Sequence, residues 1–241
     1  ASPAGVAEFV DPAVMGRLLT KEIDILTKVR DEPEHPMVAV LGGAKVSDKI
    51  GTVRTLSKVA EKILIGGAMS YTFLQALGHE IGSSRVEEDR METASSLYEE
   101  ADGALALPSD HVVAEEIDAG AASTVVEGDI PEAQMGLDIG PATVDTYRSA
   151  ILEAETVIWN GPMGVFELEP FATGTMSVAE AIADATDAGA YSVVGGGDSV
   201  SALARAGVTD RISHVSTGGG AMLTFLEGAP LPGVEALTDA E

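Results

Sequence analysis

Cysteine is absent from the 241-residue sequence, and this absence excludes several kinds of chemistry at once. Without a thiol there can be no disulfide, no thiolate zinc site and no cysteine nucleophile. The four histidines are scattered without the spacing typical of metal ligands: His35, His79, His111 and His214. The sequence therefore gives no sign of a zinc site or a disulfide framework.

Aromatic residues and long apolar runs are also scarce. Aromatics make up 4% of the chain while hydrophobic residues make up 45%, so we expect a globular core built from Ala, Val, Leu, Ile and Met. No apolar run approaches the roughly 20 residues needed to cross a bilayer. A basic segment followed by an apolar one, as in a signal peptide, is not visible at the N-terminus. These features predict a soluble protein without membrane partners, and we expect a cytoplasmic location.

Basic residues are few. Fourteen Lys and Arg oppose 39 Asp and Glu, giving a net charge of −25, which argues against nucleic-acid partners and anionic membranes. One interpretation is adaptation to a salty, halophilic cytoplasm, where salt screens self-repulsion. The other is a calcium-binding or acidic interaction surface. We favour salt adaptation, because the acids are dispersed and no Asp-x-Asp-x-Asp-Gly loop occurs.

Short apolar runs alternate with helical periodicity along most of the chain, which is typical of βαβ units. We expect an α/β fold: a Rossmann-like, three-layer parallel sheet with helices on both faces. Residues 31–241 would form a single domain, and residues 1–30 an interdomain segment and connecting helix. The stretch 118–129 is expected to be a surface excursion. Strands are predicted at 36–41, 62–65, 104–107, 111–114, 156–159, 190–194 and 213–215, and helices at 10–30, 47–59, 70–77, 142–154, 175–185, 200–206 and 221–226.

The segment LGGAKVSDK, residues 41–49, places a glycine pair directly after a predicted strand. Glycine lets the backbone approach a ligand closely, and a following helix offers free N–H groups. Lys45 and Lys49 would share a helix face if the helix begins early enough, and two ammonium groups there suit a polyphosphate. A solvated surface pair balanced by Asp48 is an equal alternative. The segment is not a Walker A loop, because that pattern is absent.

Two further glycine loops also follow predicted strands. In VVGGGDSV, residues 193–200, Asp198 is either a helix N-cap or a carboxylate ligand for Mg²⁺. In HVSTGGGAML, residues 214–223, three glycines before a helix can present N–H donors to an anion. Because the carboxyl ends of parallel strands meet at one edge, three such loops together predict a ligand site there.

The segment TVIWNGPMGVFE, residues 156–167, combines a polar turn with apolar neighbours. Trp159, Met163, Val165 and Phe166 could sandwich a flat purine, with Glu167 accepting from ribose hydroxyls. Packing of Trp159 and Phe166 in the core is the more usual fate of such aromatics.

Six segments in order closely resemble the carboxy-terminal, nucleotide-binding domain of the phosphoglycerate kinase family: GGAKVSDKI, IGGAMSYTFL, GLDIGPATV, WNGPMGVFE, VVGGGDS and SHVSTGGGA. The resemblance spans nearly the whole chain. It implies a glycolytic kinase that transfers a phosphoryl group between 1,3-bisphosphoglycerate and Mg-ADP, giving 3-phosphoglycerate and Mg-ATP. Phosphoryl transfer of this kind works mainly by positioning and charge neutralisation.

The resemblance also implies roles for individual residues. Lys45 and Lys49 would contact the phosphates during transfer, and Gly218, Gly219 and Gly220 would direct N–H groups at the migrating phosphoryl. Asp198 would hold Mg²⁺, while Ser199 stands where the family usually has Thr and would contact phosphate. The remaining nucleotide contacts would come from Gly42, Gly43, Ala44, Gly66, Gly67, Asn160, Pro162, Glu167, Gly196 and Gly197.

The family also has an amino-terminal domain with a basic substrate site, and nothing in these 241 residues resembles it. We therefore expect a fragment or part of a longer protein, monomeric as the full enzyme, whose isolated chain turns over negligibly. The alternative is a stand-alone nucleotide-binding module without chemistry. A dinucleotide-dependent dehydrogenase is disfavoured, because no G-x-G-x-x-G opens a helix.

Overall fold

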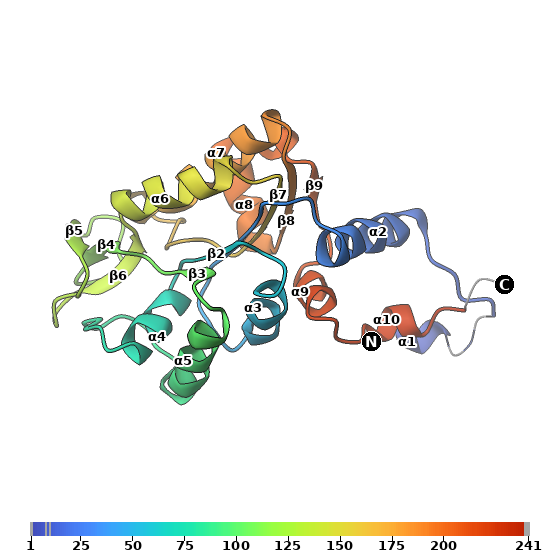
Figure 1. The fold of residues 1–241 in the computed structure, drawn as a ribbon, viewed down its shortest axis with the longest axis horizontal. Coiled ribbons are helices and arrows are strands. Elements are labelled where there is room, and N and C mark those ends of the chain that lie inside the picture. The colour runs from blue at the N-terminus through green and yellow to red at the C-terminus, as the bar shows by residue number, and fades with distance from the viewer. Residues whose placement is uncertain (1, 8, 10, 239–241) are drawn as a thin grey trace.

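The computed structural model describes residues 2–7, 9 and 11–238, and a six-stranded parallel sheet is its centre (Figure 1). The strand order is β3-β2-β1-β7-β8-β9, and every neighbouring pair is parallel. The expected α/β fold with a parallel sheet is confirmed. The strands are β1 (Met37–Leu41), β2 (Lys62–Ile65), β3 (Leu105–Ala106), β7 (Thr156–Asn160), β8 (Tyr191–Gly195) and β9 (His214–Val215).

Helices cover both faces of this sheet because its strands are apolar on both sides. Along β1, Val38 and Val40 pack into one core while Met37, Ala39 and Leu41 pack into the other. The first face carries α6 (Pro141–Leu152), α7 (Thr173–Asp187) and α8 (Gly197–Ala206). The second carries α2 (Arg17–Asp31), α3 (Ile50–Leu56), α4 (Met69–Ala76), α5 (Met91–Glu100) and α9 (Gly220–Leu226).

A second, antiparallel sheet of three strands lies at one end of the molecule and was not predicted. Its order is β5 (Thr124–Glu127), β4 (Asp110–Ala114) and β6 (Met135–Ile139). Residues 111–114 thus belong to this sheet and not to the parallel one, and part of the expected surface excursion at 118–129 is strand. Antiparallel strands can be joined without a crossover helix, so helix–strand alternation gave no signal for them.

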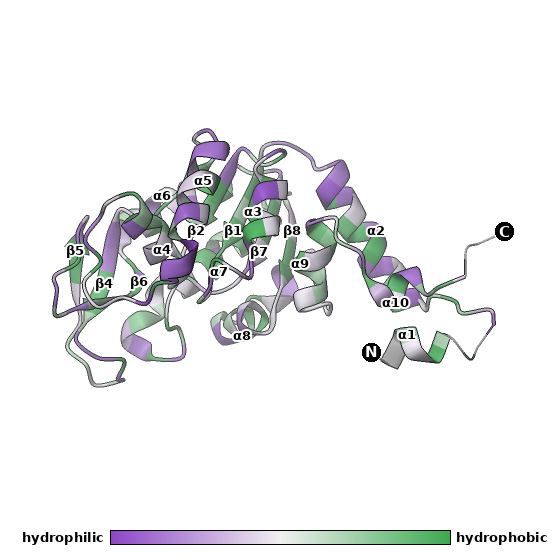
Figure 2. Cartoon of the chain, turned by 90° about the horizontal axis from the view of Figure 1, so that it is seen from below, coloured by the Kyte–Doolittle hydropathy of each residue, from purple (hydrophilic) through white to green (hydrophobic). Residues whose placement is uncertain are grey.

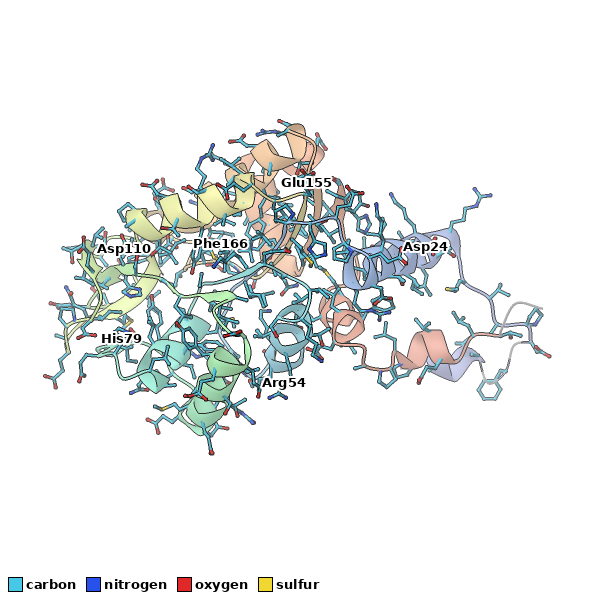
Figure 3. The ribbon with its side chains drawn as sticks, viewed as in Figure 1. Asp24, Arg54, His79, Asp110, Glu155 and Phe166 are labelled. Carbon is cyan, nitrogen blue, oxygen red and sulfur yellow. The ribbon has the colours of Figure 1, made fainter. Side chains whose placement is uncertain are left out.

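Asp110 ties the small sheet to the main body. The side chain of Asp110 is labelled in Figure 3. Its carboxylate accepts hydrogen bonds from the backbone N–H groups of Ala142 (2.9 Å) and Thr143 (2.8 Å), in the first turn of α6. A carboxylate at a helix N-terminus accepts hydrogen bonds from free N–H groups, and its negative charge interacts favourably with the positive end of the helix dipole. The small sheet is therefore held in place beside the carboxyl edge of the large one.

The long amino-terminal helix begins later than predicted. The expected helix covered residues 10–30, whereas α2 covers Arg17–Asp31, and residue 10 lies outside the described residues. Leu26 and Val29 are buried, but Val14 and Leu18 are 71% and 61% exposed. Figure 2 shows the resulting mixture of apolar and polar positions along α2. The helix is therefore amphipathic, with part of its apolar surface uncovered.

A buried carboxylate joins α2 to the segment after β9. Glu22 is 6% exposed and accepts hydrogen bonds from Ser216 Oγ (2.8 Å) and Thr217 N (2.8 Å). The remaining elements are α1 (Ser2–Ala7), α10 (Pro232–Glu235) and short 3₁₀ turns at Glu88–Arg90, Glu169–Phe171 and Thr209–Arg211. Throughout the described ranges, none of the helices has the length and apolar character that crossing a bilayer requires.

Candidate nucleotide site

Four neighbouring strands end at the same edge of the large sheet. The last residue of β1, Leu41, is in register with Ile65 of β2 and with Asn160 of β7, and Asn160 is in register with Gly195 of β8. The loops that follow these strands must therefore lie side by side. The expectation that the glycine loops gather at one edge is met for these four strands.

Glycines let these loops interlock. A Cβ at Gly161 would lie 2.3 Å from the carbonyl oxygen of Gly42, and one at Gly67 would lie 2.5 Å from the nitrogen of Gly43. Both Gly161 and Gly67 also have positive φ, which favours glycine. Side chains at these positions would push the loops apart.

The loop N–H groups are used within the protein. Gly42 donates to Asn160 O (3.0 Å), Gly43 to Pro162 O (2.9 Å) and Gly67 to Met163 O (2.8 Å). Gly66 donates to Leu41 O (2.9 Å). These glycines therefore bring backbone segments together, and their N–H groups are not free for an anion.

A polar cleft of about 260 Å³ lies above the ends of β1, β7 and β8. Both predicted lysines line it, although α3 begins only at Ile50, so they lie on a loop and do not share a helix face. Lys45 is exposed, whereas Lys49 is only 8% exposed. The cleft residues are Gly42, Gly43, Ala44, Lys45, Asp48, Lys49, Asn160, Gly161, Pro162, Gly196, Gly197, Asp198 and Ser199.

Lys49 is held in the cleft wall by Asn160. Its Nζ donates to Asn160 Oδ1 (2.7 Å), and Asn160 Nδ2 donates in turn to Gly195 O (2.9 Å). Burial lowers the pKa of Lys49, against the opposing influence of Asp48, Asp198 and Glu227. Phosphate oxygens in the cleft would favour the charged ammonium and so relieve part of this desolvation. A bound anion would therefore stabilise the buried ammonium group of Lys49.

The amino-terminal turn of α8 supplies the other side of the cleft. Asp198 is exposed there, while Ser199 is fully buried and its Oγ accepts from Gly161 N (2.7 Å). The Ser199 hydroxyl thus joins α8 to the turn after β7, and its expected contact with phosphate stays a prediction. Among the described residues, no side chain caps α8, so the first N–H groups of this ten-residue helix face the cleft without a protein partner.

A second pocket, of about 300 Å³, adjoins the cleft and is mostly apolar. The two share Gly43, Ala44, Pro162 and Asp198. Predicted residues Gly67 and Glu167 line this second pocket, but its far wall was missed. The missed lining residues are Ala68, Tyr71, Arg85, Ile117, Met135, Gly136, Leu137 and Gly164.

Trp159 and Phe166 do not line either space. They are 0% and 5% exposed and belong to the core between the sheet and α6, α7 and α8. The purine sandwich suggested for them is therefore wrong, and core packing is correct. Met163 and Val165 from the same segment do line the apolar pocket.

Two other predicted groups lie outside these linings. Gly66 is covered by Met163, since a Cβ there would lie 2.4 Å from its sulfur atom. Gly218, Gly219 and Gly220 follow β9, the strand beside β8, and Gly218 lines a separate groove between α2 and α9. The role predicted for these three glycines stays a prediction.

The carboxylates suit a magnesium–phosphate complex better than a closed metal site. No cluster of three His, Cys, Asp or Glu side chains suitable for a metal occurs in the part of the chain that the structure describes. Asp48 and Asp198 nevertheless line the same cleft. Magnesium in kinases is commonly held by one or two carboxylates together with substrate phosphates, which fits this arrangement.

Buried Asp138 fixes the far wall of the apolar pocket. It is 1% exposed, and its Oδ2 accepts from Gly174 N (2.6 Å) at the start of α7. Thr175 Oγ1 accepts from the N–H groups of Met163 (3.0 Å) and Gly164 (3.2 Å). Burial raises the pKa of Asp138 to about 7, although the hydrogen bonds from Gly174 and Ile139 act to lower it.

Asp138→Asn is expected to flatten the pH dependence of stability. A folded pKa near 7 against the ordinary 3.8 means that this group stabilises the fold most below pH 4. That contribution is lost as the pH rises from about 4 to 7, on the order of 4 kcal/mol. Urea unfolding at pH 4 and pH 8 measures this loss. Between these two pH values the free energy of unfolding should fall by about this amount more in the unaltered protein than in the variant.

Exposed Asp145→Asn serves as the matched control, because it removes one carboxylate from the surface of α6. An Asp138→Asn variant whose stability follows that of the unaltered protein at every pH would show that Asp138 titrates normally.

Comparisons with known proteins agree over almost the entire chain. A sequence model described as Phosphoglycerate kinase matches residues 1–229. The phosphoglycerate kinase of Salinibacter ruber is 71% identical over 240 residues, covering 100% of this chain and 60% of that protein. That of Thermosipho africanus is 50% identical over 244 residues, covering 99% of this chain and 60% of that protein.

Solved structures give the same result. Phosphoglycerate kinase from Coxiella burnetii aligns with a TM-score of 0.91 at 41% identity, covering 98% of this chain and 61% of that one. The enzyme from Pyrococcus horikoshii OT3 aligns with a TM-score of 0.84 at 34% identity, and the alignment covers 98% of this chain and 60% of that one. The chain thus spans about 60% of the length of the relatives it matches. By sequence and by fold, the chain belongs to the phosphoglycerate kinase family.

Proposed function

We propose that these residues form the nucleotide-binding part of a phosphoglycerate kinase. In a protein that also contains the family's amino-terminal domain, the reaction is reversible phosphoryl transfer between 1,3-bisphosphoglycerate and Mg-ADP. The observation that carries the proposal is the continuity of the polar cleft with the apolar pocket. One space suits a polyphosphate and the other suits a base, with Pro162 and Asp198 between them.

Each part of the cleft has a task in this proposal. The ammonium groups of Lys45 and Lys49 and the amino-terminal N–H groups of α8 neutralise the phosphate oxygens. Asp198 holds the magnesium ion, which supplies charge neutralisation between the phosphates when bound. Asn160 orients Lys49 through the 2.7 Å hydrogen bond. Glu167 accepts from the ribose, and Gly218, Gly219 and Gly220 serve the migrating phosphoryl from the neighbouring strand.

The proposal extends to the complete enzyme. The acceptor 3-phosphoglycerate would be bound by the amino-terminal domain, and the complete enzyme would be a cytoplasmic monomer that uses Mg²⁺ and ATP or ADP. Salt adaptation remains our interpretation of the −25 charge, supported by how evenly the acids are spread. It implies a melting temperature that rises with KCl, whereas a flat or falling one would contradict it.

Binding of Mg-ADP to residues 1–241, measured by calorimetry, tests the proposed function. Asp198→Asn is expected to weaken Mg-ADP binding about tenfold or more and to remove most of its dependence on magnesium, because a carboxylate ligand is lost. Asp210→Asn is the control, because Asp210 is exposed and lies in a 3₁₀ turn outside the cleft. It should change neither the affinity for Mg-ADP nor the dependence of that affinity on magnesium. Failure of the unaltered chain to bind Mg-ADP, or equal affinity with and without Mg²⁺, would overturn the proposal.

A further inference from the structure

Arg85 is a basic residue in the lining of the apolar pocket. Of the described residues that line that pocket, Arg85 alone is a cation, whereas Lys45 and Lys49 line the neighbouring polar cleft. The other charged side chains of the pocket wall are Glu167 and Asp198. A guanidinium here lies on the side of the site where the base would be, away from the lysines.

The backbone around Arg85 is fixed on both sides. Ser84 Oγ accepts from Gly136 N (2.9 Å), which attaches the segment to the pocket wall at β6. Two residues after Arg85, the N–H of Glu87 donates to Thr72 Oγ1 (3.2 Å), and the Glu87 carboxylate accepts from Ser47 N (3.0 Å). The backbone at Arg85 is thus held between β6 on one side and α4 and the loop after β1 on the other.

The guanidinium of Arg85 has no partner among the residues that the structure describes. Six of the eight arginines form ion pairs with carboxylates: Arg30, Arg54, Arg90, Arg148, Arg205 and Arg211. Within the described part of the chain, Arg85 makes neither an ion pair nor a hydrogen bond, although acidic residues outnumber basic ones by 39 to 14. An exposed arginine without a carboxylate partner in so acidic a chain is available to a ligand.

The rest of the pocket lacks a flat partner for a base. Its walls are Ile117, Met135, Leu137, Met163 and Val165, together with backbone at the glycines. The one aromatic side chain in the lining, Tyr71, is only 3% exposed. A guanidinium is planar, weakly hydrated and stacks on aromatic rings, which a lysine ammonium does less well.

We propose that Arg85 contacts the base of the bound nucleotide by stacking its guanidinium on one face of the purine ring. This inference rests on the proposed function and names the residue that holds the base within that site. Arg85 would thus supply the flat, cationic contact that the methionine and aliphatic lining of the pocket lacks.

Calorimetry of Mg-ADP with four forms of the full 241-residue chain tests the proposal. Arg85→Leu is expected to raise the Kd about three- to tenfold, and Arg85→Lys to recover only part of this loss. Arg17→Leu is the matched control, because it removes the same charge from the start of α2, where Arg17 has no ion pair with any residue that the structure describes. The control should leave the Kd unchanged, and melting temperatures of all forms should agree, because both arginines are exposed.

Three outcomes would overturn the inference while leaving the proposed function intact: an unchanged Kd in Arg85→Leu, full recovery in Arg85→Lys, or an equal loss in Arg17→Leu. The last two would mean that charge alone matters. If the unaltered chain did not bind Mg-ADP, the proposed function and this inference would both fail.

Discussion

Replacing Lys45 by alanine is expected to lower kcat about 10²- to 10³-fold, the usual loss when one group that stabilises developing charge is removed. Lys45 lines the cleft on a loop and is exposed, so its ammonium can follow a phosphoryl group as it moves. The Kd for Mg-ADP should rise by no more than about tenfold, because Lys49 and the start of α8 still hold the phosphates. The chemical step would thus suffer more than binding.

The measurement requires a protein in which residues 1–241 follow the amino-terminal domain of a relative such as that of Salinibacter ruber. Steady-state kinetics gives kcat, and calorimetry gives the Kd. Lys58→Ala is the control, because Lys58 is exposed and lies outside both spaces of the site. Equal losses of kcat and affinity in Lys45→Ala would instead favour a binding module without chemistry.

Gly161→Ala is expected to lower the free energy of unfolding by about 2 to 4 kcal/mol, a large part of the stability of a typical domain. The new methyl group would lie 2.3 Å from the carbonyl oxygen of Gly42, and the φ of +97° is unfavourable for alanine. Backbone strain contributes about 1 to 2 kcal/mol and overpacking about as much again. Urea unfolding followed by circular dichroism measures the sum.

Gly207→Ala separates the two contributions. Gly207 ends α8 with a φ of +72°, but a Cβ there would meet no atom within 4 Å. This variant should lose only about 1 kcal/mol, the strain alone. If Gly161→Ala were no worse than Gly207→Ala, the loops would be able to separate, and their interlocking would not limit stability.

The large sheet could be predicted because its strands are short apolar runs, most of them closed by glycine, and this is a local pattern. The small sheet could not. Residues 124–127 form an edge strand that is largely exposed, so no alternation of buried and exposed positions marked it. Helix α5 was missed as well, since only Ala94 and Leu97 of its ten residues are buried. Neither element buries enough of its residues for a periodic pattern to mark it in the sequence.

Within the site, too, residues marked by a local sequence pattern were predicted, and residues placed by the tertiary fold were missed. Lys45, Lys49 and Asp198 follow strand ends, so parallel topology alone brought them to one cleft. Tyr71 and Leu137 were missed because they reach the apolar pocket from α4 and from the unpredicted β6. The buried hydroxyl of Ser199 could not be foreseen either, because its partner Gly161 is 38 residues away.

The bonded loop backbone has a consequence for the thermodynamics of nucleotide binding. Gly42, Gly43 and Gly67 already donate their N–H groups to the end of β7 and the turn that follows it, so the floor of the site is preorganised before a nucleotide arrives. The conformational entropy lost on association then falls mainly on exposed side chains such as Lys45 and Arg85, and little of it on the main chain.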